Sequence, residues 1–263
     1  MAEKEMGLIW GSGSGPCFKA MVALHEKEFG DIKKTLISFS EKGHKGPAVI
    51  AKNPKGSVQM FSSDSPQENR RIRTEHTHEK CKSSSSVPTF NDGDIVVNES
   101  MAILLYLEHT YPNKGTRLLP SDPAGYAKVI QATMEAQENL TMKIMVKCIF
   151  YNMMTDEASR KQESFQKAIK ANIEEAQKEL AIWEDKLKLS DGDFICGKDF
   201  TLADVVLFTF LATVVRFGSS LGKFPALKSY YDRLRERPSI KASWPPHWSE
   251  GELADEKKIL KGI

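Results

Sequence analysis

The segment 87–108 limits what this chain can fold into more than any other part of the sequence. Its pattern predicts a strand over 87–90, a turn around Gly93, a second strand over 95–97 and the start of a helix at Glu99. Two short strands joined by a turn rich in aspartate and glycine are typical of a β-hairpin. A hairpin that leads directly into a helix favours a mixed α/β domain.

The dipeptide Val87-Pro88 stands at the mouth of this hairpin. Proline is the residue for which a cis peptide bond costs little, so this bond is a candidate cis bond. In that geometry the backbone N–H and C=O of Val87 turn outward, where an extended peptide can pair with them as an added strand. Glu99 and Ser100 follow at a helix N-terminus, where free N–H groups and the helix dipole hold a carboxylate. A peptide clamp beside an anion site suits a small acidic peptide, and glutathione is the obvious candidate.

These features also resemble a known family. The cis-proline clamp, the pair Glu99-Ser100 and the helix with Tyr106-Leu107-Glu108 are together similar to the N-terminal domain of the cytosolic glutathione transferases. The opening segment 8–17 and the closing segment 237–246 resemble the rho class of aquatic animals, near the theta, zeta and phi groups. The resemblance covers nearly the whole chain except residues 57–86. It implies an enzyme that conjugates the thiolate of reduced glutathione to xenobiotic or lipid-peroxidation electrophiles, uses no further cofactor and forms a homodimer.

The resemblance implies a thioredoxin-like N-terminal domain followed by an all-helical domain, and the residue pattern agrees. Strand patterns over 8–10 and 35–39 enclose a helical pattern over 17–28, and from Asp122 onward only helical periodicity occurs. The fold class that we predict is therefore α/β followed by all-α.

We place the boundary in the turn-rich stretch that follows Tyr111. The predicted domains are a glutathione-binding domain over 6–112, a helical electrophile-binding domain over 122–250 and a C-terminal tail over 251–263. Within the helical domain, apolar residues recur every three or four positions between Phe165 and Leu187, which predicts one long amphipathic helix. Thr201-Leu202-Ala203-Asp204 has the pattern of a capping box at the start of another helix.

Residues 57–86 differ from everything around them. They contain many serines and charged residues and few apolar ones, so disorder is the expectation. In related transferases an Asn-Pro-x-Gly motif leads within a residue or two into the Val-Pro pair, whereas here 30 residues separate Gly56 from Val87. His76, His78 and Cys81 include metal-binding residue types but lack a fourth ligand, so we predict no metal site. We interpret the segment as a looped-out insertion, or as an unspliced or mispredicted coding segment.

Composition limits the partners and the compartment. The net charge of +2 gives no reason to expect a nucleic-acid or membrane partner. The charged start lacks the apolar stretch of a signal peptide, and the most apolar segment, 205–215, is too short to span a membrane. The 4 cysteines are scattered, as suits reduced thiols. We expect a cytoplasmic protein that binds neither nucleic acid nor membrane.

The chemistry is expected at the glycine-rich turn that opens the first helix. A thiol with a pKa near 8.5 is mostly protonated at neutral pH, and a lowering of about two units makes it mostly thiolate. One charge-assisted hydrogen bond plus the helix dipole is of that size. The theta and zeta enzymes carry a serine three residues before the helix cysteine, and this resemblance indicates Ser14 as the thiolate donor. Ser12 remains an alternative, and so does Cys17, which would make the enzyme a thiol-disulfide type.

The remaining glutathione contacts are implied by the resemblance. His44-Lys45 would face the glycine carboxylate, as in theta and phi enzymes. Val87-Pro88 would pair with the cysteinyl backbone, and Glu99-Ser100 would hold the ammonium and carboxylate of the γ-glutamyl group. Glutathione is a co-substrate here, not a cofactor.

The electrophile is expected against the helical domain, although most apolar residues on its helices are core. The candidates for this wall lie on the first long helix and near the end of the buried one: Met134, Gln137, Glu138, Thr141, Arg216 and Phe217. An alternative function is that of a binding protein on the same fold, catalytically impaired because the segment 57–86 disturbs the clamp.

Overall fold

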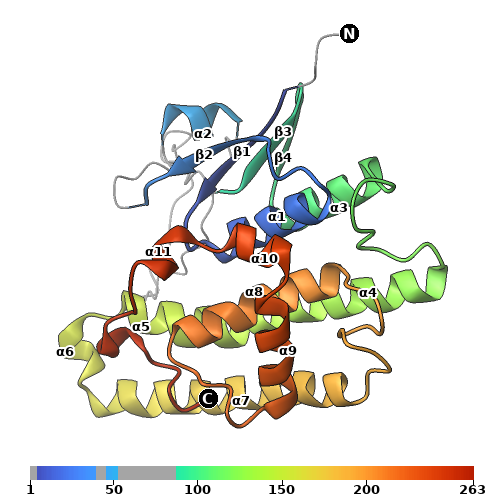
Figure 1. Ribbon diagram of the computed structural model, residues 1–263. Helices are drawn as coiled ribbons and strands as arrows, with labels where there is room; N and C mark the ends of the chain where they lie inside the picture. The colour runs from blue at the N-terminus through green and yellow to red at the C-terminus, as the bar shows by residue number, and fades with distance from the viewer. Residues whose placement is uncertain (1–4, 40–45, 53–86) are drawn as a thin grey trace, which may run out of the picture.

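The computed structural model describes residues 5–39, 46–52 and 87–263, in which a sheet-containing domain stands on a larger helical domain (Figure 1). The elements of the first domain are β1 (Met6–Gly11), α1 (Gly15–Glu26), β2 (Lys33–Ile37), α2 (Pro47–Lys52), β3 (Thr89–Asp92), β4 (Ile95–Asn98) and α3 (Ser100–Thr110).

The described strands form one sheet in the order β2-β1-β3-β4. β1 pairs in parallel with β2, which requires the crossover through α1, and in antiparallel with β3, which forms a hairpin with β4. The predicted thioredoxin-like arrangement is confirmed. Small corrections concern the element ends: β2 begins at Lys33 instead of Thr35, and α1 begins at Gly15 instead of Cys17. The Val87–Pro88 peptide bond is cis, as the sequence predicts.

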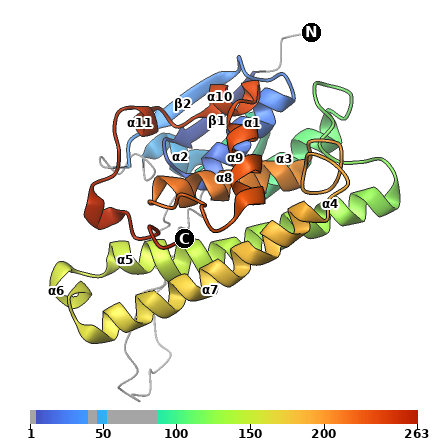
Figure 2. The same cartoon turned by 60° about the horizontal axis from the view of Figure 1, so that its bottom comes forward.

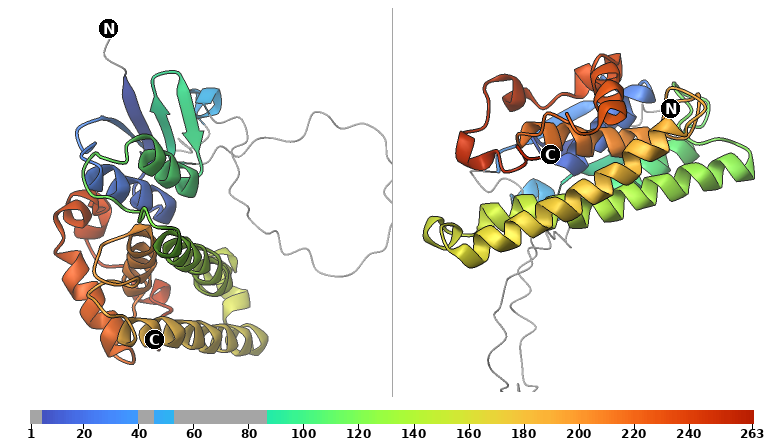
Figure 3. Two further views of the ribbon diagram at one scale, coloured as in Figure 1. Left: turned by 90° about the vertical axis from the view of Figure 1, so that its right-hand side faces the viewer. Right: turned by 90° about the horizontal axis from the view of Figure 1, so that it is seen from below.

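Both faces of the sheet are covered. α1 and α3 lie between the sheet and the helical domain (Figure 3, left). Leu8 belongs to the large core on that side, whereas its neighbour Ile9 packs with Val49 of α2 and with Val87 in a second cluster. Successive residues of a strand point to opposite faces, so the apolar pair in β1 is what anchors a layer on each side.

The helical domain begins at Pro123, after a connection that follows α3. Its elements are α4 (Pro123–Glu135), η2 (Ala136–Phe150, a π-helix), α5 (Tyr151–Met154), α6 (Glu157–Arg160), α7 (Glu163–Lys188), α8 (Leu202–Arg216), α9 (Pro225–Arg235), α10 (Pro238–Ser243), α11 (Pro246–Ser249) and η3 (Asp255–Lys257). α4, η2 and α5 follow one another along one helical rod, and α7 runs beside it (Figure 2).

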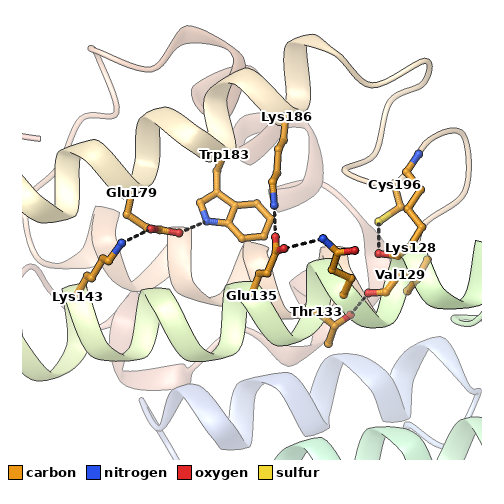
Figure 4. Close-up of polar contacts among 10 residues, drawn as sticks. Lys128, Val129, Thr133, Glu135, Lys143, Glu179, Trp183, Lys186 and Cys196 are labelled. Carbon is orange, nitrogen blue, oxygen red and sulfur yellow. Dashed lines mark hydrogen bonds and ion pairs between the residues drawn. The ribbon is translucent and has the colours of Figure 1, made fainter.

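The contact between α7 and the α4–η2 rod is both apolar and ionic (Figure 4). The predicted stripe on α7 is confirmed, because Phe165, Leu180 and Trp183 are among its buried residues. Lys143 of η2 donates to Glu179 at 2.6 Å, and the Trp183 indole N–H donates to the same carboxylate at 3.0 Å. The Glu179 carboxylate is buried, so two donors offset the cost of removing its charge from water.

α8 is the central helix of the domain. The predicted capping box is present at the start of α8. The Thr201 side chain pairs with the backbone of Asp204, the third residue of the helix, and the Asp204 carboxylate accepts from the Thr201 N–H at 2.8 Å. Asp204 also accepts from the Ile195 N–H at 3.0 Å and from the Tyr230 hydroxyl at 2.8 Å. One buried carboxylate therefore ties the start of α8 to the preceding loop and to α9.

The two domains are joined through the C-terminal end of α1. Glu26 accepts two hydrogen bonds from the Arg237 guanidinium, at 2.6 and 2.8 Å, and another from Ser239 at the start of α10. Bidentate arginine–carboxylate pairs fix orientation as well as distance. α1 is therefore held at a defined angle against the helical domain.

The last residues return to the domain instead of leaving it. The Leu260 N–H donates to the Phe217 carbonyl at 3.0 Å, and the Ile263 carbonyl accepts from the Ser219 hydroxyl at 2.8 Å. Leu260 and Ile263 are both buried. The segment predicted as a C-terminal tail thus packs against the end of α8, and α11 precedes it between the two domains (Figure 1).

No helix in the described part of the chain is long and apolar enough to cross a membrane.

Candidate active site

The turn between β1 and α1 places the predicted thiolate donor at a helix N-terminus. Gly13 has φ +79°, a conformation that glycine adopts freely, and Ser14 is the N-cap residue of α1. The Ser14 Oγ accepts from the Cys17 N–H at 3.4 Å. That bond uses a lone pair of the oxygen, so the hydroxyl proton of Ser14 is a donor, directed to the Cys17 thiol or to a ligand at the start of the helix.

Cys17 has the surroundings of a packing residue. Its side chain is fully buried, and its Sγ accepts from the Gly11 N–H at 3.3 Å. Burial raises the pKa of the Cys17 thiol to about 11, although the hydrogen bonds from Ser14 and Gly11 oppose that rise. The thiol is therefore protonated at neutral pH and is a poor nucleophile.

Ser12 is engaged by a residue from the other end of the chain. Its Oγ lies 2.6 Å from Nδ1 of His247, on α11. Burial and the positive charge of Arg216 lower the pKa of His247, and Glu250 opposes this shift. The ring is therefore mostly neutral at pH 7.

The clamp residues lie on the α2 side of the sheet. The Val87 side chain is buried against Ile9 and Val49. Among the described residues, neither the N–H nor the C=O of Val87 pairs with another backbone group. From the sequence, these are the two groups that we expect to pair with an extended peptide.

Glu99 and Ser100 stand at the start of α3, as expected. Glu99 is the N-cap residue, has φ +70° and makes no capping bond with its side chain, whereas Ser100 is buried. Asn98 accepts from the Thr89 hydroxyl at 2.8 Å and donates to the Lys52 carbonyl at 3.2 Å. The positive φ of Glu99 costs about 1–3 kcal/mol in a residue other than glycine, and backbone strain of this kind is typical of ligand sites. The hairpin therefore holds the clamp and the helix N-terminus at a fixed separation.

His44 and Lys45 lie outside the described residues, and so does the segment 57–86 with His76, His78 and Cys81. Among the residues that are described, no group of three or more His, Cys, Asp or Glu side chains could hold a metal ion.

The predicted electrophile wall is brought together only in part. Gln137 and Thr141 are linked by a hydrogen bond of 3.4 Å on η2, at the contact with α1. Met134 and Glu138 are exposed on the same rod. Arg216 and Phe217 instead hold the C-terminal segment: the Arg216 guanidinium donates to the Gly251 carbonyl at 2.5 Å, and the Phe217 carbonyl accepts from Leu260.

Both the sequence and the fold are similar to those of known proteins. Residues 141–243 match the family model described as glutathione S-transferase, C-terminal domain. Glutathione S-transferase A of Pleuronectes platessa is 37% identical to this chain over 247 residues, which cover 94% of each protein. This chain belongs to the glutathione S-transferase family. It is therefore a transferase, with the fold that the family shares.

Solved structures show the same fold. A glutathione S-transferase of the Antarctic clam Laternula elliptica is 34% identical, with a TM-score of 0.78 and coverage of 98% of this chain and 100% of that one. A delta-class glutathione transferase of Nilaparvata lugens has a TM-score of 0.67 at 22% identity, over 98% of this chain and 99% of that one. The second likeness is one of fold alone.

Two residues near the candidate site of this glutathione S-transferase were missed from the sequence. Lys19 is buried in α1, where its ammonium donates to Gln137 at 2.7 Å and lies 4.1 Å from the centroid of the Phe210 ring. A lysine within the apolar pattern 17–28 was the available signal. His247 carried no such signal, because its contact with Ser12 spans most of the chain.

Proposed function

We propose that this protein is a serine-type glutathione transferase in which the Ser14 hydroxyl stabilises the thiolate of bound glutathione. The observation that carries the proposal is the cap geometry: Ser14 accepts from the Cys17 N–H, so its own proton can be donated, and the glutathione sulfur would take it over from the neutral Cys17 thiol. The competing groups are otherwise engaged, because Ser12 bonds to His247 and Cys17 is a buried, protonated thiol. The N-terminus of α1 adds its dipole to the same negative charge.

The rest of glutathione would lie along the clamp. Val87-Pro88 would pair with the cysteinyl backbone, Glu99-Ser100 would bind the γ-glutamyl end, and His44-Lys45 would face the glycine carboxylate. The electrophile would lie between the Ser14 turn and the helical domain, near Gln137. The electrophiles that we propose are xenobiotics or products of lipid peroxidation. We propose that the enzyme belongs to the rho class of glutathione transferases.

The proposed assembly is a homodimer in the cytoplasm. Ile95 and Val96 on β4 are 46% and 42% exposed, and this edge of the sheet has no further strand among the described residues. Covering such apolar side chains with a second copy of the chain would remove them from water.

The alternative of a catalytically impaired binding protein is not favoured. The discriminating feature is whether the clamp stays in place next to the segment 57–86. Val87-Pro88 has the cis bond and is packed against Ile9 and Val49, which supports a working clamp. Retention on immobilised glutathione measures the clamp without needing the right electrophile.

The rate of conjugation tests the role of Ser14. We expect Ser14→Ala to lower kcat with a generic aromatic electrophile by about 10–100-fold, because loss of one donor to a developing anion costs about 1.5–3 kcal/mol. Affinity for glutathione should change little, since the clamp and the α3 N-terminus remain.

Ser12→Ala and Cys17→Ala test the two alternative donors within the same turn. Full activity of Ser14→Ala together with an inactive Ser12→Ala would move the donor to Ser12. An inactive Cys17→Ala beside an active Ser14→Ala would make the enzyme a thiol-disulfide type.

A further inference from the structure

The contact between Ser12 and His247 joins the two ends of the chain at the proposed site. α11 does not depend on that contact for its position. The Arg216 guanidinium donates to the carbonyls of Trp248 and Gly251, at 3.5 and 2.5 Å. The Trp248 ring packs edge-on against Phe18 of α1, with 6.0 Å between the centroids. His247 is therefore held beside the Ser12 turn by contacts on both sides of it.

The His247 ring rests on bare backbone. A Cβ atom added to Gly13 would lie 2.4 Å from Cε1 and 2.8 Å from Nε2 of the ring. No side chain fits in that space, so glycine at this position lets the imidazole approach the turn. The edge of the ring that carries Nε2 thus lies against Gly13, the residue before Ser14 in the sequence.

The hydrogen bond at Nδ1 decides what the other nitrogen can do. Burial and Arg216 of α8 lower the pKa of His247, with Glu250 of its own segment opposing, so the ring is mostly neutral at pH 7. A neutral ring that accepts the Ser12 proton at Nδ1 carries its own proton at Nε2. Among the described residues, none hydrogen-bonds to Nε2. In the tautomer in which Nδ1 accepts from Ser12, the ring therefore presents an N–H donor against Gly13, the residue that precedes Ser14.

We propose that His247 is a further catalytic residue of this site: Ser12 orients its ring, and its Nε2–H donates a second hydrogen bond to the sulfur of bound glutathione. This inference rests on the proposed function. The thiol S–H bond breaks with both electrons left on sulfur, and the proton passes to solvent, so no co-reactant is needed. Donors aimed at a developing negative charge are a general means of catalysis. Ser12 is a positioning residue in this account, because it acts through His247.

Two substitutions separate the two ring nitrogens. His247→Asn keeps a polar group near the Nδ1 position, facing Ser12, and removes the group at Nε2. His247→Gln places an amide N–H near the Nε2 position. The readout is the pKa of the bound glutathione thiol, followed through the ultraviolet absorbance of the thiolate as pH is varied. This quantity does not depend on turnover, and the difference between the two variants separates a donor at Nε2 from a merely structural role of the segment.

We expect His247→Asn to raise the pKa of the bound thiol by about one unit. At a pH well below the wild-type pKa, this is a tenfold loss of thiolate. His247→Gln should recover most of the loss, and Ser12→Ala should give an intermediate rise. His109→Gln, at an exposed histidine near the end of α3, is the control and should match the wild type.

An unchanged thiol pKa in His247→Asn would overturn the proposal. Equal rises in His247→Asn and His247→Gln would also overturn it, because the effect would then come from the segment and not from Nε2. Failure of the proposed function looks different: the wild-type protein itself would not be retained on immobilised glutathione and would show no thiolate absorbance.

Discussion

At the scale of single residues, Lys19 is the most unusual group in the interior. Its side chain is 2% exposed, and among the described residues its ammonium has no carboxylate partner. It has a hydrogen bond to Gln137 and the face of the Phe210 ring instead. Burial lowers the pKa of Lys19 from 10.5 to about 7, because the charged form loses its hydration. The residue lies between α1 and η2, where the electrophile is proposed to bind.

This burial predicts a pH-dependent cost to stability. Between pH 7 and 10.5 the unfolded chain binds a proton at Lys19 that the folded chain does not, so the free energy of unfolding rises with pH in this window. The change is at most about 1.4 kcal/mol per pH unit. Lys19→Met removes this titration. We compare the free energy of unfolding of Lys19→Met with that of wild type at each pH. The difference, variant minus wild type, should be larger at pH 7 than at pH 9 by about 2 kcal/mol.

Denaturant unfolding at the two pH values measures this difference. Lys170→Met, at an exposed lysine of α7, is the control and should show the same relative stability at both. If the free energies of unfolding of Lys19→Met and wild type change with pH in the same way across this range, Lys19 keeps an ordinary pKa.

At the scale of elements, the start of α8 is the most concentrated polar contact in the helical domain. Asp204 is fully buried and accepts four hydrogen bonds, from the Thr201 N–H and hydroxyl, the Ile195 N–H and the Tyr230 hydroxyl. Removing the acceptor leaves several buried donors without a partner, each at a cost of about 1–3 kcal/mol. α8 carries the Arg216 that holds α11, so this cap also supports the proposed site.

Asp204→Ala should therefore lower the free energy of unfolding by about 3–5 kcal/mol, and thermal or denaturant unfolding measures the loss. Asp199→Ala, at an exposed aspartate of the same loop, should change it by less than about 0.5 kcal/mol. Equal stability of the two variants would contradict the role assigned to the cap.

At the scale of the whole molecule, the path from α2 to the clamp is short. The Lys52 carbonyl accepts from Asn98, and the Lys52 ammonium donates to Asn91 at 2.9 Å, so α2 ends beside the hairpin. Asn98 pairs with Thr89, which follows Val87 by two residues, and four extended residues span roughly 14 Å, so we expect a connection of this length to reach the clamp. The segment 57–86 is therefore not needed to connect these elements.

Deleting residues 57–86 should leave the helical domain unchanged and tighten glutathione binding. Shortening the connection lowers the free-energy cost of closing this loop by about 2 kcal/mol. Val87-Pro88 is then tied closely to α2, so the clamp is held more firmly in its binding geometry. Calorimetry on the two proteins measures the affinity. Equal or weaker binding after the deletion would mean that the segment is neutral or belongs to the site.

The parts of the molecule that could be predicted from the sequence are those set by neighbouring residues. The strands, the cis Val87–Pro88 bond, the N-cap at Ser14 and the capping box at Thr201 all have local signals, and the resemblance supplied the fold class. The contacts between Ser12 and His247 and between Lys19 and Gln137 join residues more than a hundred positions apart. Only the packing of α1 against the helical domain brings them together, so no local pattern could indicate them.

The pH titration of the bound glutathione thiol in wild type and in Ser14→Ala tests the central claim most directly. If the Ser14 hydroxyl stabilises the thiolate, the substitution raises the pKa of the bound thiol by about one to two units, while Cys17→Ala leaves it near the wild-type value. A bound thiol with the same pKa in Ser14→Ala and in wild type would contradict it.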